Sequence, residues 1–455
     1  MNSTTLYKES ALRLVLRLSL PSMGAQISSV IMQFIDSAMV GHLDTDAAAA
    51  VGLVGGVTWL CGGLCSALTA GFTVQAAQSA GAGKEIDARK IMHLGLLSAL
   101  VLSCSMALLG LCLSDFLPIW LRADNSIHKL SIRYFNIYAL SIPLIQLNGY
   151  SAGMLQSAGN MRTPGICTIA MYAMNILFNF LLIFPSRTVD LCGNTLFIPG
   201  AGLGVTGAAL GTALAETVAA LFLLYKLLIS ESSMRLRSGE AFLLPDLKYV
   251  LFRAAKIGLP IALEQIVMRF AQLTVVGMIA PLGNAAMAAH SLAITAESFC
   301  YMPAYGIGLA QPAITGRSIG SGDKKRTREL GQAGIRLGIW ITVILAVIMF
   351  CCASQLMRLL TPNAELIQIG AILLRIEAFG VTLYAVHLVC AGILQGRGDT
   401  FISSIMVLGC LWGIRVPISM PLIPYMGVSG AWAAMSLELS IRGIIFLLRF
   451  RFSNR

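Results

Sequence analysis

The chain has 455 residues, of which 57% are hydrophobic and only 12% are charged, and its mean hydropathy is +0.79. Soluble proteins carry about 25% charged residues, so a soluble domain of this composition could not cover its own surface. The net charge of +11 would by itself also suit a nucleic-acid-binding protein. Its distribution along the chain instead indicates a membrane topology and argues against a nucleic-acid partner.

Long apolar runs recur along the whole chain. Each is about 20 residues or longer, enough to cross a hydrocarbon core about 30 Å thick as a helix, whereas a β-barrel would show short segments of alternating polarity. We therefore predict an all-α integral membrane fold with about 12 transmembrane helices. In the first half, the runs lie near 14–40, 50–77, 94–117, 131–156, 165–184 and 203–229. In the second half, they lie near 250–280, 287–316, 333–353, 368–394, 402–423 and 428–449.

The loops between these runs differ in charge. If both termini and every even-numbered loop lie on one side of the membrane, that side holds 22 of the 32 lysines and arginines and the other side holds 5. Short cytoplasmic loops carry an excess of basic residues. Both termini are therefore predicted to be cytoplasmic.

The first run contains an aspartate at membrane depth. Asp36 lies about five residues before the outer end of the run. A charge at this depth costs roughly 2.5–3.5 kcal/mol on insertion scales and is a functional candidate by default. Pro21, in the same run, removes a backbone hydrogen bond and permits a kink. A bend at Pro21 that follows a change of charge on Asp36 and a static kink are both compatible with this pattern.

The fifth and sixth runs supply partners for this carboxylate. Asn175 and Asn179 are four residues apart and share one helix face, and Asn179 has the same predicted depth as Asp36. Thr206 and Thr212 lie in the first turns of the next run. Together these residues form an oxygen-rich cluster that suits a proton or a hard cation such as Na⁺. The alternative is a polar knot that only holds helices together.

The second half carries a different set of intramembrane charges. Glu264, Glu297 and Glu377 are candidates for cavity-lining charges that attract cationic substrates, and His387 is a further cavity candidate. Glu438 and Arg442 are four residues apart, with the glutamate first, which predicts an ion pair within one helix. The five histidines show no metal-ligand spacing, so neither a structural metal nor a cofactor is predicted.

The two halves are related by a shift of 239 residues. The shift superimposes Leu20-Pro21 on Leu259-Pro260, Gly81-Ala-Gly83 on Gly320-Ser-Gly322, and Gly153-Met-Leu-Gln156 on Gly392-Ile-Leu-Gln395. Because each repeat holds six runs, the repeats are parallel, as in carriers whose two bundles rock about a central cavity. The predicted units are an N-terminal lobe of residues 1–229, a cytoplasmic linker of residues 230–249 and a C-terminal lobe of residues 250–455. The chain has no phosphate-binding loop of the Gly-x-x-x-x-Gly-Lys type and no catalytic motif, which predicts ion-gradient-driven or downhill transport rather than an enzyme.

Several motifs together resemble the MATE (multidrug and toxic compound extrusion) family over about residues 10 to 450. The motifs are Asp36-x-x-x-x-Gly41 after Pro21, Gly81-Ala-Gly83, Leu155-Gln-Ser-Ala-Gly159-Asn-Met-Arg-Thr-Pro164, Gly207-Ala-Ala-Leu-Gly-Thr212, Ala280-Pro-Leu-Gly283 and Leu394-Gln-Gly-Arg-Gly-Asp399. The resemblance implies a monomeric antiporter of the bacterial inner membrane that exports cationic or amphipathic drugs and metabolites in exchange for H⁺ or Na⁺. In this resemblance, Asp36, Asn175 and Thr212 match residues of the ion site in the N-terminal lobe.

The chain also departs from the family pattern. Asn179 stands where many DinF-type members carry a second aspartate, and Met268 and Tyr384 stand where NorM-type members carry a glutamate and an aspartate. The resemblance is therefore closer to the DinF-like type, and Tyr384 joins the candidates for the C-terminal cavity. The alternative function is a flippase for a lipid-linked saccharide or cell-wall precursor, for which Arg269, Arg375 and Arg415 would have to line a basic cavity. A membrane-embedded enzyme and a channel are weaker alternatives, because the chain lacks a catalytic cluster and a pore signature.

Overall fold

The computed structural model describes residues 9–452 apart from 42, 44, 122, 192–193 and 230–246, and nearly all of this chain is helical. The first half contains α2 (Ala11–Gly41), α3 (Thr45–Gly81), α4 (Glu85–Leu113), the short α5 (Leu117–Trp120), α6 (Asn125–Ser157), α7 (Arg162–Ile183) and α8 (Val205–Leu228). The second half contains α9 (Leu247–Ile279), η1 (Ala280–Leu282), α10 (Asn284–Gly320), α11 (Lys324–Cys351), α12 (Ala353–Leu360), α13 (Ala364–Arg397), α14 (Thr400–Cys410), η2 (Leu411–Arg415), α15 (Val416–Met426) and α16 (Val428–Phe452).

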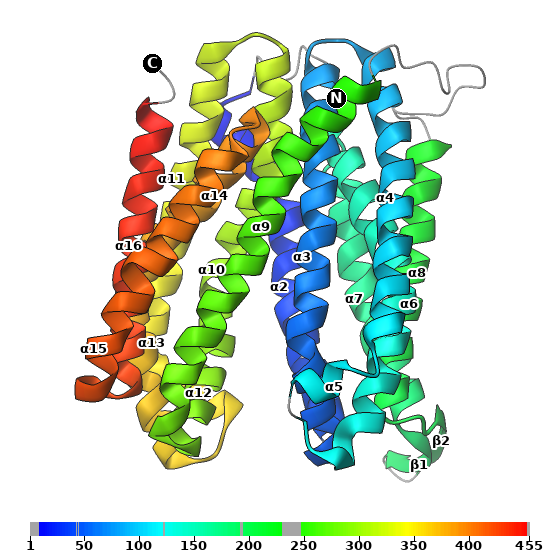
Figure 1. Ribbon diagram of the computed structural model, residues 1–455, viewed down its shortest axis with the longest axis vertical. Helices are drawn as coiled ribbons and strands as arrows, with labels where there is room; N and C mark the ends of the chain where they lie inside the picture. The colour runs from blue at the N-terminus through cyan, green and yellow to red at the C-terminus, as the bar shows by residue number, and fades with distance from the viewer. Residues whose placement is uncertain are drawn as a thin grey trace.

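Ten helical segments of the described chain are long and apolar enough to cross a membrane. The helices α6 and α10, of 33 and 37 residues, run alongside them and complete the predicted twelve (Figure 1). These two helices tolerate more polar residues because each is packed against several other helices. The helix α6 packs on α3, α4 and α8 of its own lobe, and α10 packs on α11 and α13 of its own lobe and on α2 of the other. The prediction of a multi-pass, all-helical membrane protein is confirmed.

Two predicted boundaries were wrong by nine residues. The helices α4 and α11 begin at Glu85 and Lys324, ahead of the predicted starts near 94 and 333. Their first turns are charged, so a hydropathy pattern assigns them to a loop. They are helical nonetheless, and Asp323 caps α11 by accepting a hydrogen bond from the Arg326 backbone nitrogen at 2.8 Å. An antiparallel hairpin of β1 (Pro185–Leu191) and β2 (Asn194–Ala201), which was not predicted, joins α7 to α8.

The helices form two bundles that correspond to the two sequence repeats, α2–α8 and α9–α16 (Figure 1). The helix α2 begins, and α16 ends, at the same end of the molecule, which we call the terminal end; the hairpin lies at the opposite, hairpin end. The predicted linker lies mostly outside the described residues, and its last residues, 247–249, belong to α9.

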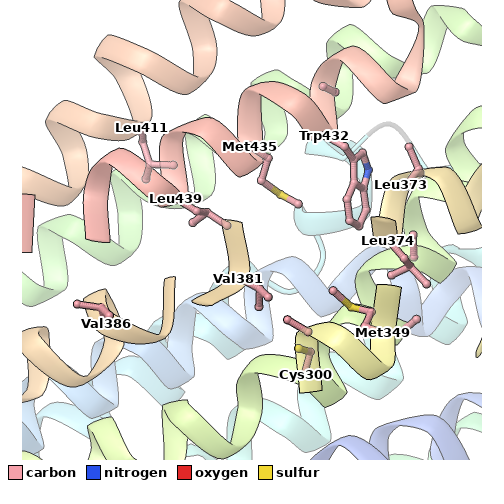
Figure 2. Packing of buried hydrophobic residues seen from close by; sticks show 14 of the residues in the cluster. Cys300, Met349, Leu373, Leu374, Val381, Val386, Leu411, Trp432, Met435 and Leu439 are labelled. Atoms are coloured by element: carbon pink, nitrogen blue, oxygen red, sulfur yellow. The ribbon is translucent and has the colours of Figure 1, made fainter. Parts of the chain in front are cut away.

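Each lobe has its own apolar core. In the C-terminal lobe, Trp432, Met435 and Leu439 of α16 face residues of α11 and α13, part of which Figure 2 shows. A separate cluster around Phe72, Tyr150 and Leu223 fills the N-terminal lobe. A third cluster joins the lobes: Leu14, Val15 and Leu18 of α2 pack with residues of α10 and α11, among them Ile314 and Leu330. The lobes therefore have separate main cores and share a smaller apolar cluster along the seam where they meet.

At the terminal end, this seam consists of reciprocal contacts. The Gln78 amide donates to the Gly396 carbonyl at 3.0 Å, and the Arg317 guanidinium donates to the Ser157 carbonyl at 3.3 Å. The 239-residue shift relates Gln78 to Arg317 and Ser157 to Gly396, so the two hydrogen bonds are counterparts under the internal symmetry. The lobes therefore contact each other at this end as the subunits of an isologous dimer do.

Two symmetry-related glycines allow this approach. A Cβ on Gly81 of α3 would collide with the backbone of Arg317, and a Cβ on Gly320 of α10 would collide with the backbone of Gln78. Helices approach this closely only where side chains are small. Toward the hairpin end, the ribbons of the two lobes diverge (Figure 1).

The helix α2 packs against both lobes near Pro21. A Cβ on Gly165 of α7 would collide with Pro21, and a Cβ on Gly306 of α10 would collide with the backbone of Ser22 and Met23. The helix that carries Asp36 is therefore held between the N-terminal bundle and the longest helix of the C-terminal bundle.

Candidate functional site

The structure brings four of the predicted site residues into one hydrogen-bonded network. The Nδ2 atom of Asn179 donates to Asp36 Oδ1 at 2.8 Å and to Asn175 Oδ1 at 3.1 Å. The Thr212 hydroxyl lies 3.0 Å from Asn175 Nδ2 and donates to the Ala208 carbonyl at 3.1 Å. Three helices, α2, α7 and α8, thus converge on one carboxylate near the hairpin end.

The side-chain amide of Asn175 can also donate to the Asp36 carboxylate if its nitrogen and oxygen exchange places. When its amide is rotated by 180°, Nδ2 lies 3.1 Å from Asp36 Oδ1 and 3.2 Å from Asp36 Oδ2, and the oxygen accepts from Thr212 at 3.0 Å. The two orientations differ only in which atom is nitrogen and which is oxygen. In either case, Asp36 is surrounded by neutral amides and a hydroxyl.

Glycines on α8 make room for this network. Gly207 and Gly211 are four residues apart and face α7. A Cβ on Gly207 would collide with the Leu182 carbonyl, and a Cβ on Gly211 would collide with the Asn179 amide. The spacing Gly207-Ala-Ala-Leu-Gly211 therefore sets the distance from α7 to α8 at which Asn179 can reach Asp36.

The network has more acceptors than donors. Asn175 and Asn179 are 2% and 1% exposed, whereas Asp36 is half-buried. Within the part of the chain that the structure describes, Asn179 Oδ1 has no hydrogen-bond partner and no ion pair includes Asp36. A site short of donors and of positive charge suits a proton or a small cation.

Thr206 does not join this network. It lies six residues before Thr212, about 9 Å away along the helix axis, at the N-terminal end of α8. Among the described residues, it makes no hydrogen bond to Asp36 or to either asparagine.

A second carboxylate of the N-terminal lobe escaped the sequence reasoning. Glu216 lies on α8 one turn after Thr212, and its Oε2 accepts a hydrogen bond from Asn148 Nδ2 of α6 at 2.7 Å. The available signal was Glu216 itself, the only charged residue from Ala213 to Leu223, with i, i+4 spacing to Thr212. This spacing indicates that the polar face of α8 continues toward the terminal end.

The predicted C-terminal candidates lie inside the lobe rather than along the seam. Glu297 and Glu377 are 5% and 0% exposed, and neither oxygen of Glu377 has a hydrogen-bond partner among the described residues. Glu264 accepts from the Ser404 hydroxyl at 2.6 Å. These carboxylates come from α9, α10 and α13, and the hydrogen bond of Glu264 is made to a residue of its own lobe.

His387 and Tyr384 belong to an aromatic stack. The His387 ring lies 4.4 Å from Phe446 and 5.8 Å from Tyr384, between ring centroids, and the Arg442 guanidinium lies 5.5 Å from the Tyr384 centroid. The predicted pair of Glu438 and Arg442 is confirmed, with Glu438 Oε1 2.9 Å from Arg442 Nε. Both partners are buried, so this pair compensates charge inside the lobe.

The three arginines of the flippase alternative do not converge. Arg269 lies over the Trp59 ring of the other lobe at 5.5 Å, and Arg375 is exposed. Arg415, in the π-helical turn η2, donates to Met435 Sδ at 2.9 Å and interacts electrostatically with the buried glutamates. These positions do not form the basic cavity that a pyrophosphate-linked substrate would need.

A family profile matches the chain twice. The MatE profile covers residues 21–181 and residues 260–420. The second match begins and ends 239 residues after the first, which is the shift that relates the two halves of the sequence.

Curated relatives match over nearly the full length. The chain is 26% identical over 438 residues to a protein of Thermotoga maritima called "Probable multidrug resistance protein NorM", covering 96% of this chain and 91% of the relative. It is 25% identical to multidrug resistance protein PmpM of Pseudomonas aeruginosa, covering 100% of this chain and 95% of that protein. These names give no support to the DinF-like subtype, which stays a prediction.

Solved structures share the fold. A MOP superfamily transporter from Pyrococcus furiosus superimposes with a TM-score of 0.90 at 20% identity, covering 100% of this chain and 98% of the other. A mutant form of the Vibrio cholerae MATE transporter VcmN superimposes with a TM-score of 0.89 at 18% identity, covering 97% of each chain. At these identities, the likeness extends to the fold alone.

Proposed function

This chain belongs to the MatE family of membrane transporters, and on that premise we propose that it is a secondary antiporter that exports small organic compounds in exchange for H⁺ or Na⁺. The compounds are cationic or amphipathic drugs and metabolites, and the membrane is the bacterial inner membrane with both termini in the cytoplasm. The family's members are transporters rather than enzymes. We expect the working unit to be a monomer, because one chain supplies both lobes.

The observation that carries this proposal is the Asp36 network. A half-buried carboxylate at membrane depth, with amide partners and no basic partner among the residues that the structure describes, can take up a proton or Na⁺ from outside. Asn175, Asn179 and Thr212 would orient it or contribute oxygen atoms to a bound Na⁺.

The packing of α2 offers a route from ion binding to movement. The helix contacts α7 at Gly165 and α10 at Gly306, on both sides of the lobe seam, and Pro21 weakens its backbone hydrogen bonding there. Neutralising Asp36 would change the packing of α2 and thereby bias the lobes toward opening at one end. The terminal end, closed by Gln78 and Arg317, would then be the cytoplasmic gate.

The experiment is efflux of the fluorescent cation ethidium from a bacterial host that lacks its own pumps. Wild type is compared with Asp36→Asn and with Glu329→Gln, an exposed carboxylate in a surface ion pair, with and without a protonophore and in Na⁺-free buffer. We expect Asp36→Asn to slow efflux at least tenfold and Glu329→Gln to leave it unchanged. Full-rate efflux by Asp36→Asn with unaltered ion dependence would refute the role of Asp36.

The flippase alternative makes a different prediction. It requires transport that depends on Arg269, Arg375 and Arg415 together, and these residues lie apart in the structure. Loss of lipid-linked sugar export, with no dye efflux by a well-expressed wild type, would favour it.

A further inference from the structure

The helices α3 and α9 separate toward the hairpin end, and glycines on α3 mark where they do so. A Cβ added to Gly71 would collide with the Ala254 backbone of α9. A Cβ added to Gly63, closer to the hairpin end, would first meet the side chain of Gln265, at 3.0 Å. Gly56 lies on the same face of α3 as Gly63, and a Cβ added there would meet nothing within 4 Å. A wedge, which we call the α3–α9 wedge, therefore opens between the lobes beyond Gln265, where their ribbons diverge (Figure 1).

A positive charge lies where this wedge begins. Arg269 follows Gln265 by one turn of α9, and its guanidinium carbon lies 5.5 Å from the centroid of the Trp59 ring of α3. Arg269 is about 15 Å along α9 from the hairpin-end terminus of that helix, and Trp59 is about 21 Å from the corresponding terminus of α3. The pair thus lies at bilayer depth and between the lobes, which is where secondary transporters hold their substrates.

Arg269 faces the wedge and not the lipid. It shares one face of α9 with Gln265 and Gln272, four residues before it and three after it. Gln272 is exposed, and Arg269 and Gln265 are half-buried. At 100° per residue, this polar face is turned about 120° from the lipid-facing side of the helix. That side consists of large apolar residues that are 51% to 65% exposed, namely Leu259, Leu263, Phe270 and Leu273.

The Arg269 guanidinium is only partly satisfied. Among the residues that the structure describes, its one hydrogen bond runs from Nη1 to Gln272 Oε1 at 2.9 Å, and its Nε has no acceptor. None of the ion pairs of the described chain includes it. The repeat does not require this charge, because Val30 occupies the equivalent position of α2. An uncompensated charge at bilayer depth is a functional candidate by default, and the partner that it calls for is an anion.

The geometry also narrows the kind of anion. A guanidinium can stack on an aromatic ring and still bind a carboxylate through two parallel N–H groups at its edge. Trp59 is 54% exposed, so its ring offers apolar surface beside the charge. A single arginine suits a group with one negative charge rather than the pyrophosphate of the flippase alternative. A flat apolar ring that carries one carboxylate matches both features.

We propose that Arg269 and Trp59 bind a planar aromatic carboxylate in the α3–α9 wedge, with the carboxylate on the guanidinium and the aromatic ring against the indole. This inference rests on the proposed antiport function and adds an anionic class of exported compound and the residues that bind it. Asp36 belongs to α2, at a position whose counterpart in α9 is Val275, so the coupling ion and the compound are held by opposite charges on two related helices.

The test is direct binding of cinnamate, a planar aromatic carboxylate, to the purified full-length protein in detergent, measured by calorimetry. Cinnamamide, which has the same shape without the charge, is the control ligand. We expect Arg269→Gln to weaken cinnamate binding at least tenfold. Arg269→Lys, which keeps the charge but loses the planar edge, and Trp59→Leu should each weaken it at least threefold. Arg358→Gln, which removes an exposed charge of the same lobe on α12, should bind within twofold of wild type.

The outcomes separate this inference from the proposed function. Wild-type affinity in Arg269→Gln, or in Trp59→Leu if the first variant does not fold, would overturn the site and leave the pair as a contact between lobes only. Equal binding of cinnamamide by wild type would overturn recognition of the carboxylate. No binding of cinnamate by wild type would overturn the aromatic acid class and leave Asp36-dependent ethidium efflux intact. Arg269-dependent binding together with full ethidium efflux by Asp36→Asn would instead refute the antiport proposal.

Discussion

Replacing Gly320 with valine should open the seam between the lobes at the terminal end. The added Cβ would collide with backbone atoms of Gln78 and Ala82, which cannot rotate away as the tip of a side chain can. The helices α3 and α10 must therefore separate. Gly81→Val should have the same effect, because Gly81 is the symmetry counterpart and meets the backbone of Arg317.

The expected shift follows from the hydrogen bonds that separation breaks. The bond from Gln78 to Gly396 is neutral and contributes about 0.5–1.5 kcal/mol, and the bond from the charged Arg317 to Ser157 contributes about 1.5–3 kcal/mol. Together they favour the closed terminal end by about 2–4.5 kcal/mol. Since 1.4 kcal/mol is a factor of ten, their loss should shift the balance toward the open end by at least roughly 30-fold.

Spin labels at the first residues of α4 and α11 would report this movement. Glu85 and Lys324 are exposed, symmetry-related and on opposite lobes at the terminal end. In a background without the native cysteines, the label-to-label distance distribution should move to longer values in Gly320→Val and Gly81→Val. Gly277→Val is the control, because no atom lies within 4 Å of the added Cβ. An unshifted distribution with normal dye efflux in both variants would refute this account of the gate.

Two further predictions concern the interiors of the lobes. Gly211→Ala should slow ethidium efflux at least tenfold, because its Cβ displaces the Asn179 amide from Asp36. The control is Gly55→Ala, where the added atom meets nothing within 4 Å and efflux should keep its wild-type rate. Equal efflux rates in the two variants would contradict the role of the Asn179–Asp36 hydrogen bond. Arg442→Met should lower the free energy of unfolding in detergent by about 3–5 kcal/mol, because it leaves Glu438 buried without its counterion. Arg449→Met, which breaks the more exposed pair with Asp399, should lower it by only about 0–1 kcal/mol, and similar losses in denaturant titrations of the two variants would be evidence against this charge assignment.

Much of the architecture could be predicted because its signals are local or repeated. The length and composition of each apolar run predict a spanning helix without knowledge of its neighbours. The repeat was detectable because glycines and prolines with backbone roles, such as Pro21 with Pro260 and Gly81 with Gly320, kept their spacing in both halves. The charged first turns of α4 and α11 were misplaced because hydropathy marks where the membrane ends, not where the helix begins.

The candidate site was predicted in part. Asp36 stood out because a carboxylate in an apolar run is costly, and the i, i+4 spacing of Asn175 and Asn179 identified one shared face. Glu216 was missed although it too is a carboxylate in an apolar run; its pairing with Asn148, 68 residues earlier, is visible only in the tertiary structure.

The sequence by itself thus determined the membrane environment, the helices and the repeat, all of which depend on residues close together in the chain or on a regular spacing. Only the tertiary structure decided which polar side chains meet, as between Asp36 and Asn179, 143 residues apart. The physical reason is the solvent: a helix in lipid is apolar on nearly every face, so hydropathy does not define its rotation about its axis. That rotation is set by close backbone contacts such as those at Gly207, Gly211 and Gly165, and with it the destination of every buried charge.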